Sequence, residues 1–557
     1  MPITPASCFV FDFHTSESQR FYAPFYCISD AMKAKACTTC RQRKLKCDAP
    51  QKFPESCSRC DKLKKACVFD PNFKRISRQH RLQQVEQELR SIRQAHGSET
   101  KRTIATHILN ATYSHESDDL FEPCQSDKQI GNVHMSANQV TDIFQLYFEK
   151  LHVYLPFRMN RSIEAIHEVC PLLFWAIIAV TTRDQLILKD LIPLVKQLAS
   201  EITLQAARSV EIVQALLILC MWPFPYYTQL EDPSFIYSGI ATQIGLQTGL
   251  HRPEFAFEFS SKQDVLRSSS QIRRTTWIAC FIVGQIQASA RGVPTTMPMD
   301  YSLLVSLDHA DTPVYLAQLG LISRLTATFS ATIGFNAHNM HGLIDPSERM
   351  NMIKLYDREF SYLKSNKLRE MEQGIEVAFL GAQLQLFSFA LHDDMPDSLD
   401  LVEIVHKAET TACRLIQLVS QSELQFLPVQ WSRSVILAAV MLLKILKSPH
   451  VGDSHLINNQ VTLAHQIFTL ITKDDDDGSQ RSDRLLLLFS VLEDKKKWPP
   501  VQCRLTASLV YDAIRVSKEY YAEVLDNIVN PSDRSLTTLE THSLDNLMPQ
   551  DIEFQQE

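Results

Sequence analysis

Six cysteines near the N-terminus follow a spacing that few folds can accommodate. They are separated as C-x2-C-x6-C-x9-C-x2-C-x6-C, so the second half repeats the internal spacing of the first: Cys37, Cys40, Cys47, Cys57, Cys60 and Cys67. The first thirty residues do not form the continuous apolar region of a secretory signal, because charged residues such as Asp12 and Arg20 interrupt them. We therefore expect reduced thiols that bind metal ions rather than disulfides.

The number of thiols limits the kind of metal site. One tetrahedral zinc ion takes four ligands, and six thiols cannot supply two separate sites of four. Two zinc ions that share two thiolates satisfy the count, since two of the six ligands are then used twice. We expect two zinc ions per chain in a binuclear cluster. A disulfide knot and two unrelated CxxC zinc sites are the alternatives.

The charge of the cysteine-rich segment points to a polyanionic partner. The whole chain has a net charge of −7, yet residues 33–93 contain 17 Lys and Arg against 6 Asp and Glu. A local excess of this size favours binding to nucleic acid.

The residues around the cysteines carry a family resemblance. The run from Ala36 to Asp48, which reads ACTTCRQRKLKCD, is followed by Cys57-Ser58-Arg59-Cys60 and Cys67. These segments resemble the fungal zinc binuclear-cluster transcription factors. The resemblance implies that Cys37 and Cys57 bridge the two metal ions and that each half forms a short helix and an extended segment. It also implies a nuclear regulator of RNA polymerase II genes, not an enzyme.

The resemblance implies how the module contacts double-stranded DNA. The family reads a CGG triplet in the major groove with residues after the second cysteine, and this role falls by position on Lys44, with Arg43 beside it. Lysine and arginine are the residue types that donate to guanine O6 and N7. Phosphate contacts are expected from the remaining basic residues: Arg41, Lys46, Lys62 and Lys64.

A short apolar seam follows the basic module. Its members are spaced 3, 4 and 3 residues apart, as in a coiled coil of less than two heptads: Leu82, Val85, Leu89 and Ile92. We expect a homodimerisation segment, because one triplet is too little sequence to specify a genomic site and the family commonly pairs two half-sites.

Most of the remaining chain is predicted to be helical. We expect the following organisation: a disordered N-terminal extension at 1–34, the zinc-cluster domain at 35–75, the coiled coil at 76–96, a linker at 97–139, an all-α regulatory domain at 140–530, and an acidic-hydrophobic tail at 531–557. The longest uninterrupted apolar stretches, 171–180 and 435–443, are shorter than a membrane span, so no membrane partner is expected.

The predicted helical domain also resembles the family. Gly249-Leu250-His251-Arg252-Pro253 and Arg273-Arg274-Thr275-Thr276-Trp277 are similar to landmarks of its middle homology region, and the cysteine module is similar to the branch of the leucine-biosynthesis regulator. In that branch the region responds to a metabolite, which implies a small-molecule effector here; a purely structural or protein-docking scaffold is the alternative. The tail is expected to recruit the transcription machinery, and a frayed terminus is the alternative.

Two other classes of function were compared with DNA binding. The usual enzyme motifs GxGxxG, GxxxxGK[ST], GxSxG and HExxH do not occur in the sequence. A zinc-dependent RNA-binding or protein-interaction module is the remaining alternative. RNA recognition relies on exposed aromatic side chains, and Phe53 is the only aromatic residue between Cys37 and Cys67, so DNA is favoured.

Overall fold

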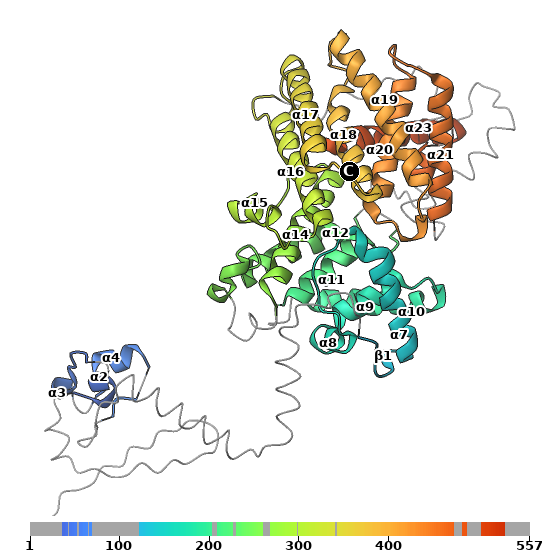
Figure 1. The fold of residues 1–557 in the computed structure, drawn as a ribbon. Helices are drawn as coiled ribbons and strands as arrows, with labels where there is room; N and C mark the ends of the chain where they lie inside the picture. The colour runs from blue at the N-terminus through green and yellow to red at the C-terminus, as the bar shows by residue number, and fades with distance from the viewer. Residues whose placement is uncertain are drawn as a thin grey trace, which may run out of the picture. The chain divides into compact units, whose positions relative to one another are not determined.

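The structure is a computed structural model, and Figure 1 shows its ribbon. It describes residues 36–42, 44–52, 55–64, 66–68, 122–202, 209–226, 230–259, 268–297, 299–339, 342–472, 482–486 and 503–529. The predicted N-terminal extension, the seam from Leu82 to Ile92, Arg43 and the C-terminal tail lie outside the described residues. The chain divides into two compact units, Met1–Asp118 and Asp119–Glu557, and each is considered by itself.

The first unit contains three short helices around the cysteines. They are α2 (Thr38–Gln42), α3 (Ala49–Lys52) and α4 (Ser58–Lys62). Helices α2 and α4 are the helices that the resemblance implies for the two halves. Helix α3 lies in the nine-residue loop between them and was not predicted.

The second unit is predominantly helical, which confirms the predicted fold class. Its α-helices are α7 (Ala137–Leu146), α8 (Ile163–Val169), α9 (Pro171–Thr181), α10 (Gln185–Glu201), α11 (Val210–Met221), α12 (Ser234–Thr248), α14 (Ser270–Arg291), α15 (Tyr301–Leu307), α16 (Val314–Gly334), α17 (Pro346–Lys367), α18 (Gln373–Phe387), α19 (Leu399–Ser420), α20 (Val429–Leu446), α21 (Ser454–Ile471) and α23 (Ser508–Val529). Short helical turns connect them: η1 (Tyr147–Leu151), η2 (His152–Tyr154), η3 (Pro253–Glu258), η4 (Ser388–Ala390), η5 (Leu424–Phe426) and η6 (Leu505–Ala507).

The end of the predicted linker is part of this helical unit. Strands β1 (Lys128–Ile130) and β2 (Val133–Met135) form an antiparallel hairpin, and Gly131 in its turn has a φ of 53°. Val133 and Met135 are buried against the helices. The helical unit therefore includes residues before position 140, because these apolar side chains pack into its core.

The residues at several helix ends are those that commonly cap helices. Ser136 and Gln139 form a reciprocal capping box at the start of α7, and Ser269 caps α14. Helices α12 and α14 end at Gly249 and Gly292, which adopt left-handed φ values of 79° and 65°.

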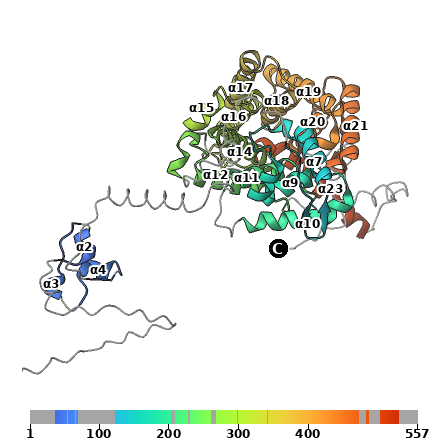
Figure 2. The ribbon, with the colours of Figure 1, turned by 60° about the horizontal axis from the view of Figure 1, so that its bottom comes forward.

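Helices with apolar residues on all sides lie in the core of the second unit. Helices α9 and α11 pack side by side, as Figures 1 and 2 show, and nearly all their residues are buried. Helix α20 is long and apolar enough to span a membrane by length and composition, but 61% of it is buried against other helices. Its apolar composition is therefore also that of a core helix.

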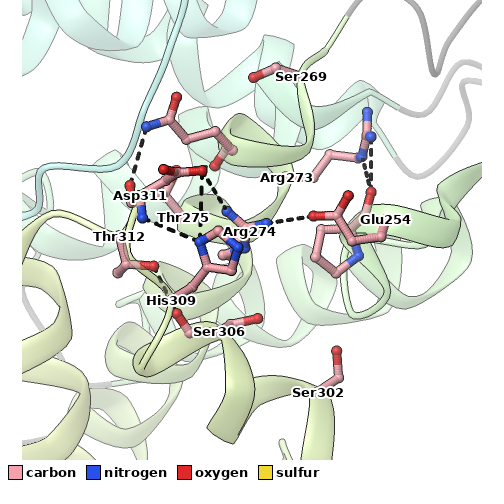
Figure 3. Close-up of polar contacts among 12 residues, drawn as sticks. Glu254, Ser269, Arg273, Arg274, Thr275, Ser302, Ser306, His309, Asp311 and Thr312 are labelled. Carbon is pink, nitrogen blue, oxygen red and sulfur yellow. Dashed lines mark hydrogen bonds and ion pairs between the residues drawn. The ribbon is translucent and has the colours of Figure 1, made fainter.

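The two family landmarks of the helical domain contact each other. The buried Arg273 guanidinium donates from Nε and Nη2 to the carbonyl oxygen of Pro253, at 3.0 and 2.9 Å (Figure 3). The neighbouring Arg274 is also buried and pairs with Glu254. The landmarks are thus explained by packing between η3 and α14.

Two histidines of this domain, His152 and His251, pack among apolar or aromatic neighbours. Burial lowers the pKa of His152 to about 3, since an imidazolium would lose its hydration there. Burial also lowers the pKa of His251, whose ring packs against Phe259 and Trp277. Neither histidine belongs to a cluster of metal-ligating side chains in the described part of the chain.

Candidate metal centre and DNA-binding face

Helices α2 and α4 each position two cysteines at the N-terminal end. Cys37 precedes α2 and Cys40 lies within it, while Cys57 is the N-cap of α4 and Cys60 lies within that helix. Residues three positions apart lie on one face of a helix, so each CxxC pair directs both thiols to the same side. These four side chains are fully buried.

The sulfur atoms lie at the separations expected around shared zinc ions. Cys37 Sγ is 4.0 Å from Cys57 Sγ, 3.7 Å from Cys60 Sγ and 3.8 Å from Cys47 Sγ, and Cys40 Sγ is 3.9 Å from Cys57 Sγ. Zn–S bonds of about 2.3 Å in a tetrahedron place two ligand sulfurs about 3.8 Å apart. The donor set therefore fits zinc.

The six thiols form two overlapping groups of four. One group contains Cys37, Cys40, Cys47 and Cys57, and the other contains Cys37, Cys57, Cys60 and Cys67; within each group the sulfurs lie within 4.8 Å of one another. Cys37 and Cys57 belong to both groups. Six thiols can thus offer two sites of four ligands, with these two residues as the shared pair.

The protonation of the thiols differs between shared and unshared positions. At Cys57 burial opposes ionisation, but hydrogen bonds from the Cys60 backbone and the neighbouring thiols outweigh it and lower the pKa to about 6. At Cys60 burial, together with the neighbouring thiols, raises the pKa to about 12. Zinc requires thiolates, so binding of the metal must release protons from the cluster.

Two pairs of residues form hydrogen bonds between the halves of the module. Ser58, after the fourth cysteine, donates from its backbone N–H to Asp48 Oδ1 at 3.1 Å and from its hydroxyl to Asp48 Oδ2. Thr38, after the first cysteine, donates from its backbone N–H and its hydroxyl to the carbonyl oxygen of Val68, at 2.9 and 3.0 Å. Sequence reasoning missed these residues, although a serine or threonine directly follows each shared cysteine.

The basic residues of the module face solvent. Those predicted to contact DNA and described by the structure are all exposed: Arg41, Lys44, Lys46, Lys62 and Lys64. Lys44 follows α2 and Lys64 follows α4, and both have a positive φ. The structure therefore places one exposed lysine at the C-terminal end of each helix.

Comparison with known protein families defines the class of protein. Residues 35–76 match the fungal Zn(2)-Cys(6) binuclear cluster domain, and residues 145–307 match the fungal specific transcription factor domain. Both matched regions are domains of the fungal zinc-cluster transcription factors, a family of regulators rather than enzymes. Its cluster domain is of the type that binds two zinc ions.

Three relatives bear names of regulatory proteins or transcription factors. The chain is 27% identical to the transcriptional regulatory protein SEF1 of Candida albicans, over 86% of this chain and 63% of the relative. It is 27% identical to the putative transcription factor SEF1 of Eremothecium gossypii, over 72% of this chain and 40% of the relative. It is 25% identical to the regulatory protein LEU3 of Saccharomyces cerevisiae, over 60% of this chain and 48% of the relative. The chain thus spans less than two thirds of the length of these curated relatives.

Proposed function

We propose that this protein is a nuclear, zinc-dependent transcription factor that binds double-stranded DNA at CGG-type half-sites and regulates RNA polymerase II genes. The observation that carries the proposal is the pair of overlapping four-sulfur groups, which supports a rigid module with exposed lysines after both helices. The six cysteines would hold the zinc ions, with Cys37 and Cys57 contributing to both groups of four, and the bound metal would fix α2 and α4 relative to each other.

The basic side chains are assigned roles by their positions in the motif that resembles the family. Lys44 acts as the base reader with Arg43 beside it, while Arg41, Lys46, Lys62 and Lys64 contact phosphates. Base contacts provide sequence preference, whereas phosphate contacts provide affinity that falls with salt.

A competition between nucleic acids tests this function. The zinc-loaded chain should bind a labelled CGG-containing duplex more tightly than a scrambled duplex and than single-stranded RNA of matched length. Equal affinity for all three would instead support a non-specific nucleic-acid binder. Tighter binding to the RNA would support the RNA-binding alternative.

We also propose that the chain acts as a homodimer through Leu82, Val85, Leu89 and Ile92. Replacing Val85 and Leu89 by Asp should abolish cooperative binding to two half-sites and preserve binding to one, because charges in the seam prevent apolar packing. Unchanged cooperativity would assign dimerisation to another segment.

The tail and the helical domain have proposed partners of their own. Residues 531–557 recruit the transcription machinery, since acidic residues keep scattered leucines accessible to a partner. Fusion of this segment to an unrelated DNA-binding domain should activate a reporter, and an inactive fusion would contradict the proposal. The helical domain takes a small-molecule effector.

A further inference from the structure

Exposed phenylalanine side chains gather at η3 in the second unit. Phe255 and Phe257 are each more than half exposed, and their ring centroids lie 6.4 Å apart. Phe259, directly after η3, is exposed as well. Single exposed apolar side chains are common on proteins, but three phenylalanines within five residues form a patch. Patches of this kind commonly mark a surface that another molecule covers.

The start of α15 extends this apolar surface. Ser302, near the N-terminal end of α15, donates from its hydroxyl to the carbonyl oxygen of His251, which lies two positions before η3 (Figure 3). The exposed apolar side chains on α15 and just before it are Met299, Tyr301, Leu304 and Val305.

The exposed aromatic side chains cover an area large enough for an interface. We call Phe255, Phe257, Phe259 and Tyr301 the aromatic face. At about 200 Å² for a fully exposed aromatic side chain, these four leave about 500 Å² accessible to solvent. The largest apolar patch on a typical monomer measures about 300–600 Å² and is often functional.

Buried arginine side chains fix the backbone that carries the phenylalanines. Arg273 is almost fully buried and donates twice to the carbonyl oxygen of Pro253, the first residue of η3. The neighbouring Arg274, also buried, pairs with Glu254 (Figure 3). The turn is therefore rigid before any partner binds, so association through it loses little conformational entropy.

The charges around the aromatic face are balanced. Arg252 Nη1 lies 3.6 Å from Glu258 Oε2, and Glu254 pairs with Arg274. The chain outside residues 33–93 carries a net negative charge, so two copies repel each other over most of their surface. An apolar surface with balanced charges lacks this repulsion. It favours a second copy of the chain over a strongly charged partner.

We propose that the aromatic face of one helical domain packs against the same face of a second copy around a two-fold axis. Phe255 and Phe257 would lie at the centre of the contact, and Arg252 and Glu258 at its rim. A standard interface buries about 800 Å² on each partner, of which the aromatic face alone could supply more than half. This contact goes beyond the proposed seam of less than two heptads and would supplement it.

Sedimentation of the full zinc-loaded chain without DNA tests the contact. The chain carries Val85→Asp and Leu89→Asp, so that the seam cannot pair. It should still dimerise at micromolar concentration. A contact of this strength would not by itself maintain cooperativity at the nanomolar concentrations at which specific DNA binding is measured.

Substitutions at matched exposed aromatic residues localise the contact. Phe257→Glu in the same chain should weaken dimerisation by at least about thirtyfold, because it places an unpaired charge at the centre of the interface. Tyr362→Glu is the control, since Tyr362 on α17 is 66% exposed and Phe257 is 62% exposed. Phe255→Ser, which adds no charge, should weaken dimerisation by about tenfold and keeps the test valid if Phe257→Glu does not fold.

A mixing experiment tests the symmetry of the contact. A labelled Phe257→Glu chain is mixed with an excess of chain that has an intact aromatic face, both with the seam substitutions. The labelled chain should stay monomeric, because a two-fold contact needs the same surface on both partners. Association of the labelled chain would contradict the two-fold arrangement.

Two further outcomes would overturn the inference. One is a seam variant that stays monomeric at all concentrations measured, and the other is an equal effect of Phe257→Glu and Tyr362→Glu. Binding of all these variants to a single CGG half-site should be unchanged. Loss of dimerisation with intact DNA binding therefore separates a failure of this contact from a failure of the proposed function.

Discussion

Lys44 and Lys64, which lie 20 positions apart, adopt the same uncommon backbone conformation, with φ values of 56° and 48°. Among the described residues other than glycine, only Leu505 shares a positive φ. The spacing equals that between Cys37 and Cys57, so the two lysines occupy equivalent positions in the two halves. The module is a structural repeat in which each helix ends in a left-handed lysine.

Lys44 is predicted to provide the sequence preference of the module. Lys44→Ala should cost about 1–3 kcal/mol on the best CGG site and little on scrambled DNA, because a base contact is lost. Lys62→Ala is the matched control, which should weaken all duplexes alike and reduce the salt dependence by about one unit. Equal losses for Lys44→Ala on both duplexes would show that Lys44 is not a base reader.

Lys64 is predicted to carry backbone strain. A side chain in the left-handed region costs about 1 kcal/mol, so Lys64→Gly should slow zinc release to a chelator by about fivefold relative to Lys64→Ala. The two variants lose the same charge and should therefore show the same reduced DNA affinity. Identical rates of zinc release would contradict the strain.

Asp48 is predicted to hold the two halves of the cluster in their relative positions. Asp48→Ala removes both acceptors for Ser58, so a chelator should remove zinc faster than from the unmodified chain. Asp61→Ala is the control, because Asp61 is an exposed acid on α4. If both variants release zinc at the same rate, the contact between Asp48 and Ser58 does not stabilise the cluster.

The pair between Arg349 and Asp394 is predicted to make the stability of the helical domain depend on pH. Burial favours the neutral acid at Asp394, but two hydrogen bonds from the buried Arg349, at 2.8 and 2.5 Å, outweigh it and lower the pKa below 3.8. A lowered pKa in the folded state means that the stabilisation is present above about pH 4 and is lost as the pH falls through the folded value.

Asp394→Asn should therefore lower the free energy of unfolding by about 2 kcal/mol at pH 7, because the buried guanidinium loses its counter-charge. The difference from the unmodified chain should shrink below pH 4, as measured by helical circular dichroism. Asp400→Asn, which affects the more exposed pair with Lys354, should cost less than about 1 kcal/mol. A difference that persists unchanged at pH 3 would contradict the ionic role of Asp394.

The cluster could be predicted from the sequence because its ligands lie within one short segment. The spacing of the cysteines determines which thiols can meet, and helices α2 and α4 bring them together as expected. The hairpin at Lys128–Met135 was also accessible, since Gly131-Asn132 between two short runs is a two-residue turn signal. The hairpin was not predicted, because the surrounding residues are polar and the segment was assigned to the linker.

The contact of Asp232 with Arg291 and Arg433 could not be predicted from local patterns. Asp232, Arg291 and Arg433 are separated by 59 and 201 positions, and they meet only after α14 and α20 have packed. Such contacts depend on tertiary packing, which periodicity does not encode.

The number of zinc ions per chain, measured by native mass spectrometry, tests the central claim most directly. The unmodified chain should carry two zinc ions. Cys37→Ser should lose both, because Cys37 belongs to both sulfur groups, whereas Cys40→Ser removes a ligand from one group only and should retain one ion more readily. A single zinc ion in the unmodified chain, or two ions retained by Cys37→Ser, would contradict the shared-thiolate cluster.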